Sequence, residues 1–249
     1  MPLRVGFDLD GTVADMYFAL RREAVALFGD DVLRKSESIS DQPQKVAAEQ
    51  SGARPDAEAT PEDDPASSPA MQELHLTARQ QSQLWDHVRK IENFWTTLPE
   101  LEAGVIARIA KTARERRWEV IFLTTRPSSA GDLVQLQSQQ WLEAHGFQYP
   151  SVFVVQRSRG RIADALQLDA FVDDRPENCL DIAVESKAKV LLIWHGDLKD
   201  VPVGAKRLGV RAVTRISDAI TLLEQLDDSR KQPAFTRFLK KAIGVATNE

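Results

Sequence analysis

The sequence predicts an α/β fold built on a doubly wound parallel sheet. Short apolar runs alternate with longer segments whose apolar residues recur at helical spacing, which is typical of parallel strands covered by helices on both faces. The run WEVIFLTTRP at 118–127 is largely apolar until it ends in two hydroxyls and a proline, as expected of a strand buried on both faces. The opening run Leu3–Leu9 reads as another strand, and it ends among two carboxylates and a glycine.

The remaining elements follow in chain order. Further strands are expected at 151–155, 170–176 and 189–194. Helices are expected at 12–28, 76–95, 101–117, 129–147, 160–168, 179–186 and 216–226. Gly146 is placed to end the helix that precedes it, because glycine readily adopts the left-handed conformation found after many helices.

Net charge, cysteine count and the length of the apolar runs limit the functions that the chain is expected to have. The chain has 249 residues and a net charge of −5, so no general basic field favours binding to a nucleic-acid polymer. Cys179 is the single cysteine, which excludes a disulfide within the chain. No apolar run approaches the roughly 20 residues of a membrane span, and no signal-type segment precedes the first strand. We expect a soluble, cytoplasmic protein that does not bind membranes.

The segment 30–70 differs from the rest of the chain. It carries ten acidic and four basic residues and five of the twelve prolines. The stretch SGARPDAEATPEDDPASSPA at 51–70 has no apolar periodicity and no aromatic residue. We therefore expect residues 36–70 to form a disordered or loosely packed loop, more readily a solvated linker than a partner-binding segment. The last segment, 229–249, contains the basic, amphipathic stretch KQPAFTRFLKKAIGV. We expect a terminal helix that docks or frays, more readily than one that binds a membrane surface.

Polar residues lie at the ends of three of the expected strands. The first run ends in Asp8, Asp10, Gly11 and Thr12, the second in Thr124, Thr125 and Arg126, and the 170–176 run in Asp173, Asp174 and Arg175. Ligands bind at the carboxyl ends of strands in open parallel sheets. If these strands are neighbours, four carboxylates crowd together and repel one another unless a cation neutralises them. Hard oxygen ligands suit Mg²⁺, and the set is suited to phosphoryl transfer.

Three stretches resemble motifs of the haloacid dehalogenase (HAD) superfamily of phosphatases. FDLDGT resembles the first motif, VIFLTT the second and FVDDRPEN the fourth, in the family's order. The resemblance implies a Rossmann-like core in which Asp8 attacks phosphorus and Asp10 is the general acid and base. It also implies that Thr124, helped by Thr125, binds the phosphoryl oxygens. The alternative for Asp8 and Asp10 is a turn and helix cap.

The resemblance also implies a magnesium site. Its ligands would be Asp8, the main-chain carbonyl of Asp10 and Asp174, with Asp173 nearby or bound through water. The family places a lysine, less often an arginine, before the fourth motif. This chain has no lysine there, and Arg157, Arg159 and Arg161 are available. Arg159 and Arg161 lie closest to the expected place, although either one could equally be a surface charge.

The long separation of the first two motifs implies a small helical cap inserted after the first strand. The predicted organisation is a core of 1–15 and 98–228, with a cap at 16–97. The stretch QLWDHVRKIENFWTTLPELEAGV resembles the 5'(3')-deoxyribonucleotidase family, as does FLTTRP. That resemblance implies a nucleoside monophosphate substrate, with Phe94, Trp95 and Trp85 stacking on the base and Arg126 in the substrate site. Core packing of these aromatics is the alternative.

Other candidate residues carry weaker signals. His75, His87, His145 and His195 lack metal-ligand spacing and are expected on the surface or at caps. Cys179 is expected to be a small helix residue, since nothing in its sequence context lowers its pKa. Two functions therefore remain open: a Mg²⁺-dependent phosphatase of a small phosphomonoester, a nucleotide or another organic phosphate, and a non-catalytic metal-binding protein of the same fold.

Overall fold

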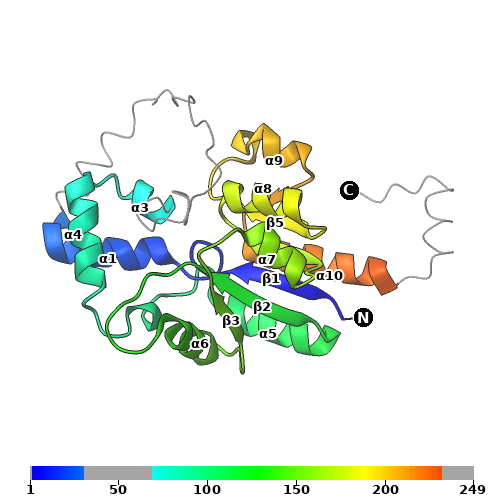
Figure 1. Cartoon of the computed structure of the whole chain (residues 1–249), viewed down its shortest axis with the longest axis horizontal. Helices are drawn as coiled ribbons and strands as arrows, with labels where there is room; N and C mark the ends of the chain where they lie inside the picture. Colours follow the sequence, from blue (N-terminus) through cyan, green and yellow to red (C-terminus); the bar gives the residue numbers. More distant parts are fainter. Residues whose placement is uncertain (1, 31–68, 232–249) are drawn as a thin grey trace.

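The protein contains one six-stranded parallel sheet, seen in a computed structural model that describes residues 2–30 and 69–231 (Figure 1). The strands are β1 (Arg4–Asp8), β2 (Glu119–Thr124), β3 (Ser151–Val154), β4 (Ala170–Asp173), β5 (Lys189–Ile193) and β6 (Arg211–Val213). Their order across the sheet is β3-β2-β1-β4-β5-β6. The order reverses at β1, whose two neighbours are β2 and β4. This confirms the α/β prediction.

Helices cover both faces of the sheet. Along the chain they are α1 (Met16–Phe28), α3 (Pro69–Glu73), α4 (Ala78–Val88), the 3₁₀ turn η3 (Phe94–Thr96), α5 (Val105–Arg116), α6 (Val134–Ala144), α7 (Arg159–Ala165), α8 (Pro176–Glu185), the 3₁₀ turn η4 (Leu198–Asp200), α9 (Val203–Arg207) and α10 (Ile216–Lys231). Helices α7, α8 and α9 lie on one face, and α5, α6 and α10 lie on the other (Figure 1). The sheet is therefore doubly wound.

Strand alternation divides the apolar side chains into two cores. Phe171 faces the core under α7 and α8, whereas the next residue of β4, Val172, faces the core under α5, α6 and α10. Leu192 and Ile193 of β5 are divided in the same way. Both faces of the central strands are thus buried from solvent, as their apolar sequences predict.

Three helices gather at one end of the molecule, beyond the sheet. Helices α1, α3 and α4 pack together there (Figure 1), and buried Leu20, Met71 and Leu84 contribute to their shared core. Glu23 and His87 link α1 to α4 at 3.2 Å. This group occupies the predicted place of the cap; the boundaries 16–97 and 98–228 stay a prediction.

Several helices begin or end later than the sequence pattern predicts. The helix expected from Thr12 begins at Met16, because Gly11–Ala14 form a turn and the Asp15 carboxylate accepts from Phe18 N at 2.9 Å. The helix expected from Leu101 begins at Val105, because the Glu100 carboxylate caps the amides of Gly104 and Ile106.

The helix expected over 76–95 also differs. It is α4 alone, begun by a capping box between Thr77 and Gln80, and a left-handed Asn93 then separates it from η3. Pro69 and Ala70 belong to α3 rather than to the expected loop, and α10 continues to Lys231. The rest of the 36–70 loop and of the tail lies outside the described residues. Over residues 2–30 and 69–231, no helix is long and apolar enough to cross a membrane.

Candidate active site

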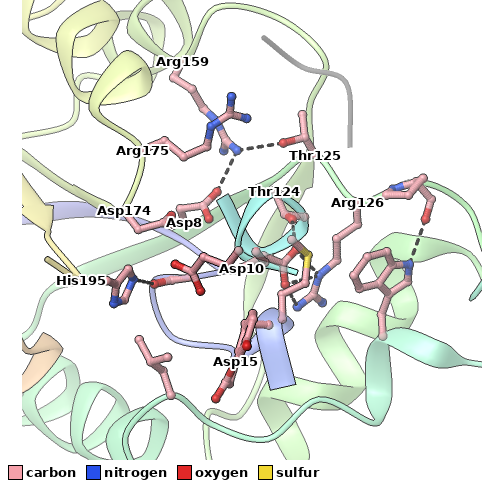
Figure 2. Close-up of a pocket in the computed structure, with 18 of the residues that line it drawn as sticks. Asp8, Asp10, Asp15, Thr124, Thr125, Arg126, Arg159, Asp174, Arg175 and His195 are labelled. Atoms are coloured by element: carbon pink, nitrogen blue, oxygen red, sulfur yellow. Dashed lines mark hydrogen bonds and ion pairs between the residues drawn. The ribbon is translucent and has the colours of Figure 1, made fainter. Parts of the chain in front are cut away.

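The polar strand ends meet at one edge of the sheet. Because β2 and β4 flank β1, the predicted Asp8, Thr124 and Asp173 clusters are neighbours in space. They border a cavity of about 340 Å³, within the range of small-molecule sites (Figure 2). Its lining residues are Asp8, Asp10, Gly11, Asp15, Met16, Tyr17, Ala70, Glu73, Trp85, Trp95, Leu101, Thr124, Thr125, Arg126, Pro127, Arg159, Asp174, Arg175 and His195. The cavity is thus shared between the strand ends and the α1, α3 and α4 group.

Three carboxylates form a compact buried cluster. Asp8, Asp173 and Asp174 each offer an oxygen within 4.8 Å of the others. Burial, followed by the charges of Asp173 and Asp8, raises the pKa of Asp174 well above its usual value, and burial raises the pKa of Asp8 and Asp173 in the same direction. A cation would remove this penalty, so the cluster fits a hard divalent ion. The Asp10 carbonyl as a further ligand stays a prediction.

Glycine is required directly beside this cluster. Gly11 has a φ of +83°, and a Cβ at this position would overlap the Asp174 carboxylate. The next residue, Thr12, donates its hydroxyl to Asp174 Oδ1 at 3.3 Å. The DGT sequence therefore turns the chain after β1, leaves space for the Asp174 carboxylate at Gly11 and donates a hydrogen bond to it from Thr12.

One arginine contacts the candidate nucleophile. Arg159 is 4% exposed, and its Nη2 donates to Asp8 Oδ1 at 2.8 Å and to Thr125 Oγ1 at 3.2 Å (Figure 2). Its Nη1 is buried and has no hydrogen-bond partner within residues 2–30 and 69–231. The pairing offsets part of the burial effect on the Asp8 pKa. Arg159 thus presents a free donor edge beside Asp8, suited to a phosphoryl oxygen.

The start of α7 decides which arginine reaches Asp8. The Asp181 carboxylate accepts from Ser158 Oγ at 2.9 Å and from Gly160 N at 2.7 Å, which fixes the helix start. Arg159 then points inward. Arg157 and Arg161 are exposed and do not line the cavity. Of the three candidate arginines, the structure brings only Arg159 to the site.

Asp10 is held by a different arginine. Arg126 Nε donates to Asp10 Oδ2 at 2.8 Å and Nη2 donates to Oδ1 at 2.7 Å, a bidentate contact (Figure 2). Thr124, 1% exposed, lies at the same carboxylate, with Oγ1 at 3.5 Å from Asp10 Oδ2. Arg126 was predicted in the substrate site, and the structure places its charge against Asp10.

The aromatics predicted to stack on a base are buried. Phe94 is 0% exposed and does not line the cavity. Trp95, also 0% exposed, lines it with its ring under the Arg126 guanidinium, and its Nε1 donates to the Pro127 carbonyl at 2.9 Å. These contacts match the core-packing alternative. Trp85 and Tyr17 also line the cavity, and they supply its aromatic surface on the side of α1 and α4.

Sequence reasoning missed several polar residues that line the cavity, among them His195, Asp15 and Glu73. His195 follows β5, and its Nε2 lies 2.8 Å from the Gly11 carbonyl, so it supports the turn after β1 (Figure 2). It is exposed, as expected, but belongs to the site. Asp15 lines the cavity from the start of α1. The rule that located Asp173, polar residues after a parallel strand, would have located His195 as well.

Comparisons with known proteins give a fold likeness. A search of protein-family models and a search of curated proteins found no match. Among solved structures, a haloacid dehalogenase-like family hydrolase from Xanthomonas campestris aligns at 17% identity over 92% of this chain and 97% of that chain, with a TM-score of 0.49. A HAD family hydrolase from Deinococcus radiodurans R1, solved with bound phosphate and sodium, aligns at 12% identity over 90% and 96%, with a TM-score of 0.48.

A third solved structure is similar at the same level. It is a haloacid dehalogenase-like family hydrolase from Streptococcus pneumoniae, at 11% identity over 89% of this chain and 98% of that chain, with a TM-score of 0.46. Other structures that align are described as dehalogenases. Because the TM-scores lie below 0.5, this likeness assigns neither an activity nor a substrate to the chain.

Proposed function

We propose that this chain is a HAD-superfamily hydrolase that cleaves phosphomonoesters through an aspartyl-phosphate on Asp8. The observation that carries the proposal is the placement of Asp8. It lies at the end of β1, in contact with Arg159 and within the carboxylate cluster, and it borders a cavity of substrate size. Asp10, two residues further along, borders the same cavity.

The residues divide the reaction into two balanced steps. Asp8 Oδ attacks phosphorus, the bond from phosphorus to the leaving oxygen breaks, and Asp10 gives its proton to that oxygen. A water oxygen then attacks phosphorus, its proton goes to Asp10, and the bond from Asp8 to phosphorus breaks to release inorganic phosphate. Arg159 and Thr124 would bind the phosphoryl oxygens in both steps.

The proposed cation is Mg²⁺, held by Asp8 and Asp174 with Asp173 beside them. It would supply positive charge that lets the buried carboxylates stay ionised near a phosphoryl dianion. We extend the proposal to nucleoside monophosphates as substrates. Of the three cavity-lining aromatics, Tyr17 and Trp85 are the proposed contacts for a base, because the Trp95 ring packs against Arg126.

A non-catalytic metal-binding protein is the second candidate. The observation that favours it is the Arg126 contact, which engages both oxygens of the proposed acid and base. In this case the carboxylate cluster would bind a cation without turnover.

Phosphate release separates the two candidates. Wild type, Asp8→Asn and the exposed control Asp164→Asn would be assayed with deoxyribonucleoside, ribonucleoside and sugar monophosphates, in Mg²⁺ and in EDTA. We expect metal-dependent release by wild type and Asp164→Asn that Asp8→Asn abolishes, and the panel ranks the substrates. Metal binding without release from any substrate would contradict the enzyme and favour the second candidate.

A further inference from the structure

The Arg126 side chain is buried and makes its contacts with core residues. Its side chain is 0% exposed, and Nη1 donates to Ser138 Oγ at 3.0 Å. Its guanidinium carbon lies 4.9 Å from the Trp95 ring centroid and 5.9 Å from that of Trp141. Cation–π contacts of this kind strengthen when they are desolvated. The guanidinium is therefore fixed on the sides that face away from Asp10.

The residues around Arg126 are themselves fixed. Trp95 Nε1 donates to the Pro127 carbonyl at 2.9 Å, and Trp141 Nε1 donates to the Leu98 carbonyl at 2.7 Å. Ser138 donates back to the Val134 carbonyl of its own helix at 2.8 Å. Since each neighbour has a partner of its own, the surroundings leave the arginine few other conformations.

The bidentate contact transmits this rigidity to Asp10. Two nitrogens of a planar guanidinium that contact both oxygens of a carboxylate fix its plane, which a lysine with one ammonium cannot do. The Nε and Nη2 donors make three contacts with the two Asp10 oxygens, and Thr124 Oγ1 lies 3.5 Å from Oδ2. The Asp10 carboxylate is thus held in one orientation at the cavity that it lines.

We propose that Arg126 is a positioning residue that orients the Asp10 carboxylate for proton transfer, with Trp95, Trp141 and Ser138 as its support. This inference rests on the proposed function, in which Asp10 serves the leaving oxygen and the attacking water. It also accounts for the burial of Trp95, whose ring supports the arginine. An acid or base held in a productive geometry raises the rate of the chemical step without tightening substrate binding.

The test compares Arg126→Met and Arg126→Lys with wild type and with Arg114→Met, an exposed arginine of α5. For the best substrate of the phosphate-release panel, we expect Arg126→Met to lower kcat by about 10²-fold, the lower end for loss of general acid–base catalysis, with KM nearly unchanged. Arg126→Lys keeps the charge but not the bidentate contact, so its kcat should fall in between. Arg114→Met should match wild type. A raised KM at unchanged kcat would overturn the proposal, because it would assign Arg126 to substrate binding.

A second measurement does not depend on turnover. Crystal structures of wild type and both Arg126 variants, grown with Mg²⁺ and beryllofluoride, report the orientation of Asp10 directly. We expect the carboxylate to rotate or lose definition in the variants, and an unchanged Asp10 would overturn the proposal. If wild type releases no phosphate while Asp10 turns in the variants, the proposed function fails and the role in proton transfer fails with it, whereas the orientation of Asp10 by Arg126 stands. If Arg126→Met does not fold, Arg126→Lys supplies the same comparison.

Discussion

Neutralising one carboxylate of the buried cluster should stabilise the metal-free protein. Asp174→Asn keeps the shape of the side chain and an oxygen that can accept from Thr12 Oγ1, but removes the charge that faces Asp8 and Asp173. The oxygens lie within 4.8 Å of one another, so at an effective dielectric constant of about 20 each fully ionised pair repels by about 3.5 kcal/mol or more. Partial protonation reduces this cost, so we expect a gain of about 1–3 kcal/mol in the free energy of unfolding at pH 8.

The direction in which the stability of the metal-free protein changes with pH follows from the direction of the pKa shifts. Because the folded-state pKa of Asp174 is raised above 3.8, the folded protein binds more protons than the unfolded chain. The stability of wild type in EDTA should therefore fall as the pH rises from about 3.8 through the raised pKa values. The advantage of Asp174→Asn should be smaller at pH 5 than at pH 8.

Urea unfolding in EDTA at both pH values measures these differences, and thermal unfolding with and without Mg²⁺ measures the effect of the cation. Mg²⁺ should stabilise wild type strongly and Asp174→Asn weakly, since one ligand has lost its charge. If Asp174→Asn unfolds more easily than wild type at pH 8 in EDTA, the carboxylates do not repel one another in the folded protein, and the reasoning for a cation site fails.

Three further predictions concern other charged or reactive groups. Asp227→Asn should lower stability at pH 7 and leave it unchanged near pH 2 in urea unfolding. Burial alone would raise the Asp227 pKa, but hydrogen bonds led by that from Lys231 lower it, so this carboxylate stabilises the fold above its unfolded pKa and loses that effect in acid. Cys179 is 0% exposed, and burial raises its pKa, so iodoacetamide at pH 8 should label it only after unfolding, as mass spectrometry would show. Arg159→Met should lower kcat/KM for phosphate release by about 10²-fold or more, with Arg159→Lys retaining part of the activity; equal activity of Arg159→Met and wild type would remove Arg159 from the site.

Local sequence places the carboxylates at strand ends, and the strand order then brings them together at one edge of the sheet. Parallel strands place their carboxyl ends together, so the residues after β1, β2 and β4 meet once those strands are neighbours. The apolar runs predict the strands themselves, and Gly11 marks the turn that follows Asp10. This much needs no knowledge of side-chain packing, because it depends on main-chain geometry and alternation.

Helix boundaries depended on contacts that a periodic pattern does not contain. The helix after Asp15 starts late because a side chain caps it, and the helix after Gly104 starts late because Glu100, outside the helix, binds its first amides. Such caps are made by single hydrogen bonds, which leave the apolar spacing of the segment unchanged.

The partners of the site charges were decided only by the tertiary structure. Arg159 and Arg161 are two residues apart on α7 and so point about 200° from one another, and the rotation of that helix selects Arg159. Arg126 contacts Asp10, 116 residues away in the chain, and its support comes from two tryptophans on separate segments. The sequence shows that these residues are charged or aromatic. Which ones are buried together depends on how the elements pack, because pairing over long sequence separations has no local signature.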